Sequence, residues 1–209
     1  MRRLLAAILI LTGLGLLAYP AARERYFDYR QQQFLQGWGK VQSAAVLAAA
    51  KETGVGQEEA TAPAPGPAPD PAREKYIQEN MEGILAIDKI GLKIPVLKKD
   101  TKENLNISVA HVADTAGPGE GGNYVIAGHR MRTYGRHFNR LHELGKGDRM
   151  EFISPDNTHL YRVFEVLVVK PEETWVLEPV GEEKLITLIT CDYSRKPSLR
   201  LVVRGKLVP

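Results

Sequence analysis

The chain has one cysteine, little excess charge and no internal repeat. Cys191 stands alone, so no disulfide can form within the chain. The formal net charge is only +3, with acids and bases interspersed. Nucleic-acid-binding proteins usually carry a basic patch or stripe, so we expect no nucleic-acid partner. The histidines and loop acids follow no compact ligand spacing, and we therefore predict no metal and no other cofactor.

The N-terminal stretch combines two arginines with a long uncharged run. Arg2 and Arg3 precede Leu4–Ala22, a run of about the 17–25 residues that cross a bilayer as a helix. A cleaved signal peptide is the alternative, since small residues lie near the end of the run, but the run exceeds a typical signal-peptide core. We therefore predict an uncleaved transmembrane helix over residues 1–22. Arginines flank both ends, so charge alone leaves its orientation open.

Residues 23–80 divide into a polar, helix-prone part and a proline-rich part. The aromatic residues of the first part suit a membrane interface, and a short surface helix that packs on nothing fits equally well. The second part contains TAPAPGPAPDP, which is typical of an extended spacer without a core. We predict a juxtamembrane segment and a flexible Pro/Ala-rich stalk, followed by a folded domain over residues 81–209.

Short apolar runs separated by turn signals fill residues 81–209. This pattern is typical of an all-β barrel or sandwich. A short helix or turn is expected over Thr101–Val109, and Phe138, Leu141 and Leu144 recur at helix-like spacing. The predicted strands lie in Glu82–Leu97 (two runs), Asn123–Ala127, Arg149–Ile153, His159–Lys170, Leu185–Thr190 and the run that starts at Leu199.

Three chemically distinct side chains fall at the ends of predicted strands. His129 follows VIAG, Cys191 ends LITC, and Arg200 begins the last strand. Antiparallel pairing of the last two strands would place Cys191 near Arg200, and a thiol beside a cation tends to have a lowered pKa. A thiolate, an imidazole and a fixed cation together suit acyl transfer. For Cys191 alone, the alternative is an inert buried thiol.

The residues around these positions resemble those of the sortases, the membrane-anchored cysteine transpeptidases of Gram-positive bacteria. The similar stretches are AGH (Ala127–His129), TLITC (Thr187–Cys191), RLVVRGKL (Arg200–Leu207) and the entry strand GILAI. The resemblance covers Glu82–Val208, and the order of histidine, cysteine and arginine agrees. The stretch AGHRMRTYGRHFNRL and the short layout are most similar to class D sortases.

The resemblance implies an eight-stranded β-barrel with short helices and assigns roles to the three residues. Cys191 would be the nucleophile, His129 the general acid/base, and Arg200 the group that positions substrate or oxyanion. The substrate would be an LPxTG-like sorting signal of secreted proteins, cut after Thr. A cell-wall precursor amine of the lipid II type would resolve the thioacyl enzyme. The catalytic domain would lie outside the cell membrane, on a single-pass anchor.

Further candidates and other functions stay open at this level. Thr190 is a candidate substrate contact because it precedes Cys191, and His111 because it lies one short connection before the His129 strand. Arg195 and Arg204 compete with Arg200 for the cationic role. The functional alternatives are a membrane-tethered, non-catalytic β-domain that binds cell-wall or surface proteins, and a cell-wall hydrolase or L,D-transpeptidase with a Cys–His pair.

Overall fold

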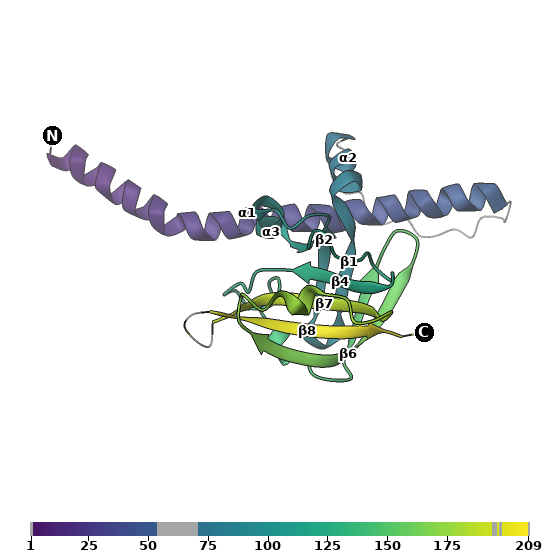
Figure 1. Cartoon of the computed structure of the whole chain (residues 1–209). Coiled ribbons are helices and arrows are strands. Elements are labelled where there is room, and N and C mark those ends of the chain that lie inside the picture. Colours follow the sequence, from purple (N-terminus) through teal and green to yellow (C-terminus); the bar gives the residue numbers. More distant parts are fainter. Residues whose placement is uncertain (1, 54–70, 194–195, 197, 209) are drawn as a thin grey trace.

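The computed structural model describes residues 2–53, 71–193, 196 and 198–208. The predicted Pro/Ala-rich stalk falls almost entirely in residues 54–70 and therefore outside the described residues. The helices are α1 (Arg2–Thr53), α2 (Pro71–Asn80) and α3 (Lys102–Ile107), and the 3-10 turns are η1 (Asp88–Ile90), η2 (Leu141–Glu143) and η3 (Thr174–Leu177) (Figure 1). The strands are β1 (Met81–Ile87), β2 (Leu92–Leu97), β3 (Val109–His111), β4 (Gly122–Ala127), β5 (Arg149–Ile153), β6 (Thr158–Val169), β7 (Lys184–Asp192) and β8 (Leu199–Leu207).

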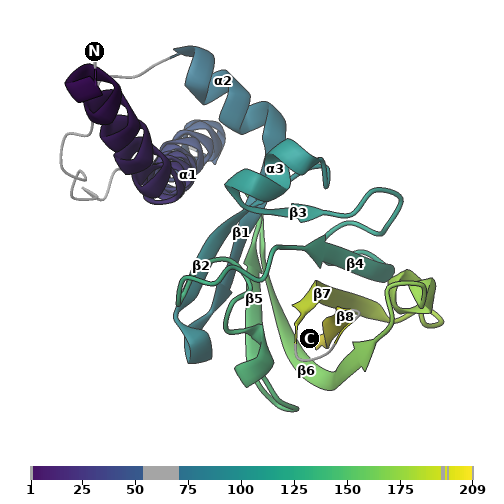
Figure 2. The same cartoon turned by 90° about the vertical axis from the view of Figure 1, so that its left-hand side faces the viewer.

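The eight strands close into a barrel in the order β1-β2-β3-β4-β7-β8-β6-β5, as the view along it in Figure 2 shows. This confirms the predicted eight-stranded β-barrel. Most neighbours are antiparallel, but β2 pairs with β3 and β4 pairs with β7 in parallel. Closure leaves no unpaired sheet edge. Strand β7 of the parallel pair carries Cys191, and His129 follows the end of β4.

Large side chains fill the inside of the barrel because every second residue of a strand faces inward. Tyr124, Phe152 and Tyr161 are fully buried there, with Phe138 from the connection after β4. Burying an aromatic or large aliphatic side chain contributes about 1.5–3 kcal/mol. The Tyr161 hydroxyl accepts a hydrogen bond from the backbone N–H of Gly119 at 2.8 Å, so its polar end is also satisfied.

The segments between the strands agree with the sequence-based predictions less well than the strands do. Helix α3 confirms the helix expected after Thr101, whose side chain caps it by accepting from Asn104 N at 3.2 Å. Phe138, Leu141 and Leu144 recur at helix-like spacing, but only the single 3-10 turn η2 forms there. A 3-10 turn, like an α-helix, places residues three apart on one side. Strand β3 has three residues, too few to show a period, and escaped prediction.

Helix α1 extends far beyond the predicted anchor and packs against the barrel domain. Phe34 and Trp38 are each 3% exposed and join a cluster with Ile77 of α2 and Ile107 of α3. Gly37 lets the two helices approach closely, because an added Cβ there would meet the Ile77 side chain. This part of the segment 23–80 is therefore not a surface helix packed on nothing.

Among the described residues, none of the helices is both long enough and apolar enough to qualify as a membrane span.

Candidate active site

Strand register brings His129 and Cys191 to the same level of the barrel. In the parallel pair β4–β7, Ala127 is the partner of Ile189. The backbone N–H of Gly128 donates to the carbonyl of Ile189 at 3.0 Å, which continues the pairing past the end of β4. His129 and Cys191 each lie two residues beyond the last paired positions. Since neighbouring strands are about 4.8 Å apart, the imidazole and the thiol belong to one rim.

Arg200 joins this rim from the other side of Cys191. The two residues are direct partners in the antiparallel pair β7–β8, which confirms the predicted hairpin. Direct partners share a face of the sheet, with Cα atoms about 4.5–5.5 Å apart. The order β4-β7-β8 therefore places histidine, cysteine and arginine on three consecutive strands. Cys191 and Arg200 are half-buried and His129 is exposed, so substrate can reach all three.

Tyr193 lies close enough to the thiol and to the guanidinium for both to affect its pKa. Burial raises the pKa of the Tyr193 hydroxyl, and the Cys191 thiol raises it further as a hydrogen-bond partner and nearby charge. Arg200 and Arg132 act in the opposite direction. Tyr193 is 61% exposed, so it stands at the mouth of the site, where sequence reasoning had placed no functional residue.

An ion pair joins the residues that directly follow His129 and Cys191. The Arg130 guanidinium donates to Asp192 Oδ1 at 3.0 Å, and the two side chains are only 23% and 11% exposed. The contact ties the end of β7 to the loop after β4 and so restrains the distance between thiol and imidazole. Sequence reasoning missed it, although opposite charges one residue beyond each predicted site residue were the available signal.

Arg204 and Arg195, the competing cations, differ from Arg200 in their surroundings. Arg204 is 4% exposed, donates to Glu165 Oε2 at 3.1 Å and lies opposite Thr187, four residues or about 13 Å along the strand from Arg200. Arg195 lies outside the described residues. Arg200 is thus the described arginine that pairs directly with the cysteine.

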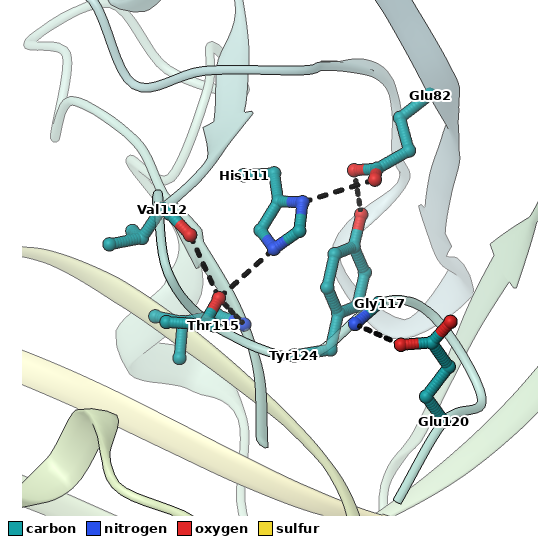
Figure 3. Close-up of polar contacts among 8 residues, drawn as sticks. Glu82, His111, Val112, Thr115, Gly117, Glu120 and Tyr124 are labelled. Carbon is teal, nitrogen blue, oxygen red and sulfur yellow. Dashed lines mark hydrogen bonds and ion pairs between the residues drawn. The ribbon is translucent and has the colours of Figure 1, made fainter. Parts of the chain in front are cut away.

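His111 belongs to a separate hydrogen-bonded network (Figure 3). Its Nδ1 lies 3.0 Å from Glu82 Oε1 and its Nε2 lies 3.0 Å from Thr115 Oγ1. The Thr115 hydroxyl donates to Val112 O and must accept from Nε2, while Nδ1 faces a carboxylate, so an imidazolium fits both bonds. Tyr124 donates to the other Glu82 oxygen at 2.7 Å. Burial lowers the pKa of His111, but the hydrogen bond and charge of Glu82 outweigh it and raise the pKa overall.

His111 and Thr190, the two predicted substrate contacts, both have side chains engaged or buried within the protein. Both ring nitrogens of His111 are engaged with protein groups, so a direct contact with substrate would require breaking this network. Thr190 is 2% exposed and faces Leu201 of the barrel core in the β7–β8 pairing, which leaves its backbone, not its hydroxyl, closer to the rim. Both roles stay predictions.

The connection between β6 and β7 covers the outer face of the same strands. The Asn123 amide donates to the carbonyl of Val176 at 2.9 Å and accepts from the Thr187 hydroxyl at 2.6 Å. Val176 packs with Val169 and Val202, with Ile189 against them. Ile189 and Val202 lie two residues before Cys191 and two after Arg200, so this buried packing supports the strands just short of the thiol.

Within the described part of the chain, no three His, Cys, Asp or Glu side chains gather in a way that could hold a metal ion.

Comparisons with known proteins agree with this geometry. The family model described as Sortase domain matches residues 85–208. Sortase A of Bacillus anthracis is 38% identical over 126 residues, which are 60% of this chain and 59% of that protein. Sortase D of Bacillus subtilis (strain 168) is 29% identical over 129 residues, 60% of this chain and 63% of that protein. The solved structure of a Clostridium perfringens sortase D5 transpeptidase has a TM-score of 0.57 and 30% identity, covering 65% of this chain and 86% of that one.

The chain belongs to the sortase family, whose members are cysteine transpeptidases. The predicted resemblance is thereby confirmed at the level of the family. The chain spans about three fifths of the length of the two sortase relatives compared above.

Proposed function

We propose that this protein is a cysteine transpeptidase that cuts a sorting-signal peptide and joins the freed carbonyl to an amine. The observation that carries the proposal is the register of β4, β7 and β8, which sets His129, Cys191 and Arg200 side by side on one accessible rim. The family match supports it independently.

In the first half-reaction, the Cys191 sulfur attacks the scissile peptide carbonyl. The new C–S bond forms, the peptide C–N bond breaks, and His129 gives a proton to the leaving amine. Arg200, as the direct strand partner of Cys191, lies where it can donate to the carbonyl oxygen as negative charge develops. The product is a thioester between Cys191 and the new carboxyl end.

In the second half-reaction, an acceptor amine attacks the thioester carbonyl. His129 takes a proton from the attacking nitrogen, and Cys191 leaves as thiolate. Water can attack in the same way and would give hydrolysis. Transpeptidation therefore depends on how well the site favours the amine over water, which is the feature that separates a transpeptidase from a protease.

For the donor, we propose an LPxTG-like signal of a secreted protein, cut after Thr. The match to the sortase family supports this donor. For the acceptor, we propose a cell-wall precursor amine of the lipid II type. The stretch Ala127–Leu141 and the similarity to Sortase D support class D. The uncharged run Leu4–Ala22 supports a single-pass anchor, and the likeness to the sortases supports a catalytic domain outside the cell.

The test is to incubate the full-length protein in detergent with LPxTG- and LPxTA-type peptides and an amine, and to follow products by mass spectrometry. We expect a product cut after Thr and joined to the amine, absent with Cys191→Ala. Cleavage without amine incorporation would support the thioacyl step and contradict transpeptidation. No Cys191-dependent cleavage across a varied peptide set would favour the alternative, a tethered domain that binds cell-wall or surface proteins.

A further inference from the structure

Arg204 is a buried cation on strand β8 that the proposed reaction does not use. The residue is 4% exposed, and its Nη1 atom donates to Glu165 Oε2 at 3.1 Å. Its Nε and Nη2 atoms are also buried, and neither has a hydrogen-bond partner among the described residues. A buried charge with open donors is costly unless neighbouring groups stabilise it, so the surroundings of this guanidinium have to supply that stabilisation.

Two aromatic rings lie beside the guanidinium. The Arg204 Cζ atom is 5.6 Å from the ring centroid of Phe164 and 6.0 Å from that of Trp175, within the range in which a ring face attracts a cation. Phe164 belongs to β6, the neighbour of β8 in the barrel, whereas Trp175 belongs to η3 in the connection between β6 and β7. The contact of Arg204 with the indole therefore joins this connection to β8.

The same connection continues from the indole to the strands that carry the rim residues. Val176 is 4% exposed and packs against Val169 and Val202. Val169 is the direct partner of Arg200, which in turn is the direct partner of Cys191. The connection thus covers the outer face of the sheet up to the level of the rim, and a peptide that approaches the thiol along this face has to pass its edge.

We propose that Arg204 and Trp175 are positioning residues for the donor peptide. The guanidinium holds the connection against β8, and the connection in this position forms one wall of the path to the thiol. The pair sets the apparent affinity for the donor, whereas the bond-making steps depend on the rim residues, whose spacing is fixed by strand register. The inference rests on the proposed function, because it needs a peptide that approaches Cys191.

The experiment measures kcat and KM for an LPxTG-type peptide with the full-length protein in detergent. Trp175→Leu removes the ring face at a position that is 45% exposed, and we expect it to raise KM about fivefold with kcat unchanged. Trp175→Phe keeps a ring face and should stay near the wild type. Because Trp175 is half exposed, both variants should fold even where a substitution of the buried arginine does not.

Substitutions of Arg204 test the other partner of the contact. Arg204→Met should raise KM as much as Trp175→Leu, and Arg204→Lys, which keeps the cation, should recover most of the loss. Combining Arg204→Met with Trp175→Leu should have no larger effect than either change alone, because both remove the same contact.

The matched control is Lys206→Met. Lys206 is another cation on this face of β8, but it is exposed and pairs with Glu183 at 2.6 Å instead of with a ring. Because exposed ion pairs contribute little, this variant should keep the wild-type kcat and KM.

Three results would overturn the positioning role while cleavage of the peptide still supports the proposed function. These are a Trp175→Leu protein with the wild-type KM, a loss in kcat instead of a rise in KM, and a Lys206→Met protein shifted as much as Trp175→Leu. Additive effects in the double variant would also overturn it. Absence of Cys191-dependent cleavage across a varied peptide set would overturn both.

Discussion

Two histidines at the ends of the neighbouring strands β3 and β4 have different roles: one stabilises the fold, and the other is available for proton transfer. His111 closes β3 with both ring nitrogens bonded to Glu82 and Thr115, and its side chain is 18% exposed. His129 follows β4 and is exposed. Its backbone carbonyl accepts from the Phe138 N–H at 3.2 Å, but its ring forms no hydrogen bond with the described residues. A ring whose bonds are all made inside the protein holds the structure together, whereas a ring with open bonds can exchange protons with a ligand.

Replacing each histidine with glutamine should distinguish the two roles most clearly, since one variant should lose activity and the other stability. We expect His129→Gln to lower the rate of peptide cleavage about 10²- to 10⁴-fold, the range that general acid–base catalysis contributes. Its urea midpoint should stay near the wild-type value, because exposed substitutions usually change stability by less than about 0.5 kcal/mol. Peptide cleavage assays and urea unfolding test both parts. Wild-type activity in His129→Gln would remove His129 from the mechanism.

His111→Gln should show the reverse. The neutral amide leaves the partly buried Glu82 carboxylate without its cationic partner, so we expect a loss of about 1–2 kcal/mol in unfolding free energy. Activity of the folded protein should remain within about threefold of wild type. A loss of activity as large as that of His129→Gln, measured below the unfolding transition, would instead place His111 in the reaction.

The Arg130–Asp192 pair is expected to have a smaller effect that is confined to the rim. We expect Arg130→Gln to lower kcat/KM about tenfold by loosening the alignment of imidazole and thiol. Arg130→Lys should recover most of the loss, since it keeps the charge. The rate of Cys191 alkylation as a function of pH separates alignment from folding. Equal losses in the Gln and Lys variants would argue against the ion pair.

Acid should destabilise the fold through a third histidine. Burial first, and then the charges of Arg136 and His129, lower the pKa of His137 to about 4. The unfolded chain takes up a proton near pH 6.5 and the folded chain does not, so this contribution is complete above pH 6.5 and is lost as pH falls toward 4. His137→Asn, which suits the positive φ of 44° there, should flatten this part of the stability curve in urea titrations.

The raised pKa of His111 predicts the smallest change in stability, and this stability is lost as pH rises, not as it falls. Because its folded pKa is raised, its contribution is complete below the unfolded value of 6.5 and is lost as pH rises through the folded value. Urea midpoints from pH 6 upward should fall in wild type and fall less in His111→Gln. An identical slope in both proteins would contradict an imidazolium at this site.

The barrel and the three rim residues could be predicted because their signals are local. Alternating apolar residues mark β7 and β8, and their turn signals place Cys191 opposite Arg200 without knowledge of other strands. The assignment of His129 came from its place after a strand and from the likeness of AGH and TLITC to one family.

What escaped prediction depends on contacts between distant segments. The Arg130–Asp192 pair requires knowing that β4 and β7 are parallel neighbours, and no turn joins them to reveal it. The docking of α1 was hidden because Phe34 and Trp38 suit a membrane interface as well as a protein surface. The single 3-10 turn η2 replaced an expected helical spacing because both place residues three apart on one side.

The parallel pairing of β4 and β7 has a consequence for how the protein folds. The Arg130–Asp192 contact spans 62 positions of the chain, and the strands between them, β5 and β6, pair with β1 and β8. Non-local pairings of this kind form slowly, since the chain must lose loop entropy before they stabilise it. A chain whose barrel has not closed would therefore carry a thiol with no imidazole beside it. Reactivity toward peptides would arise only when the barrel closes, so recovery of activity during refolding should follow the slowest folding phase.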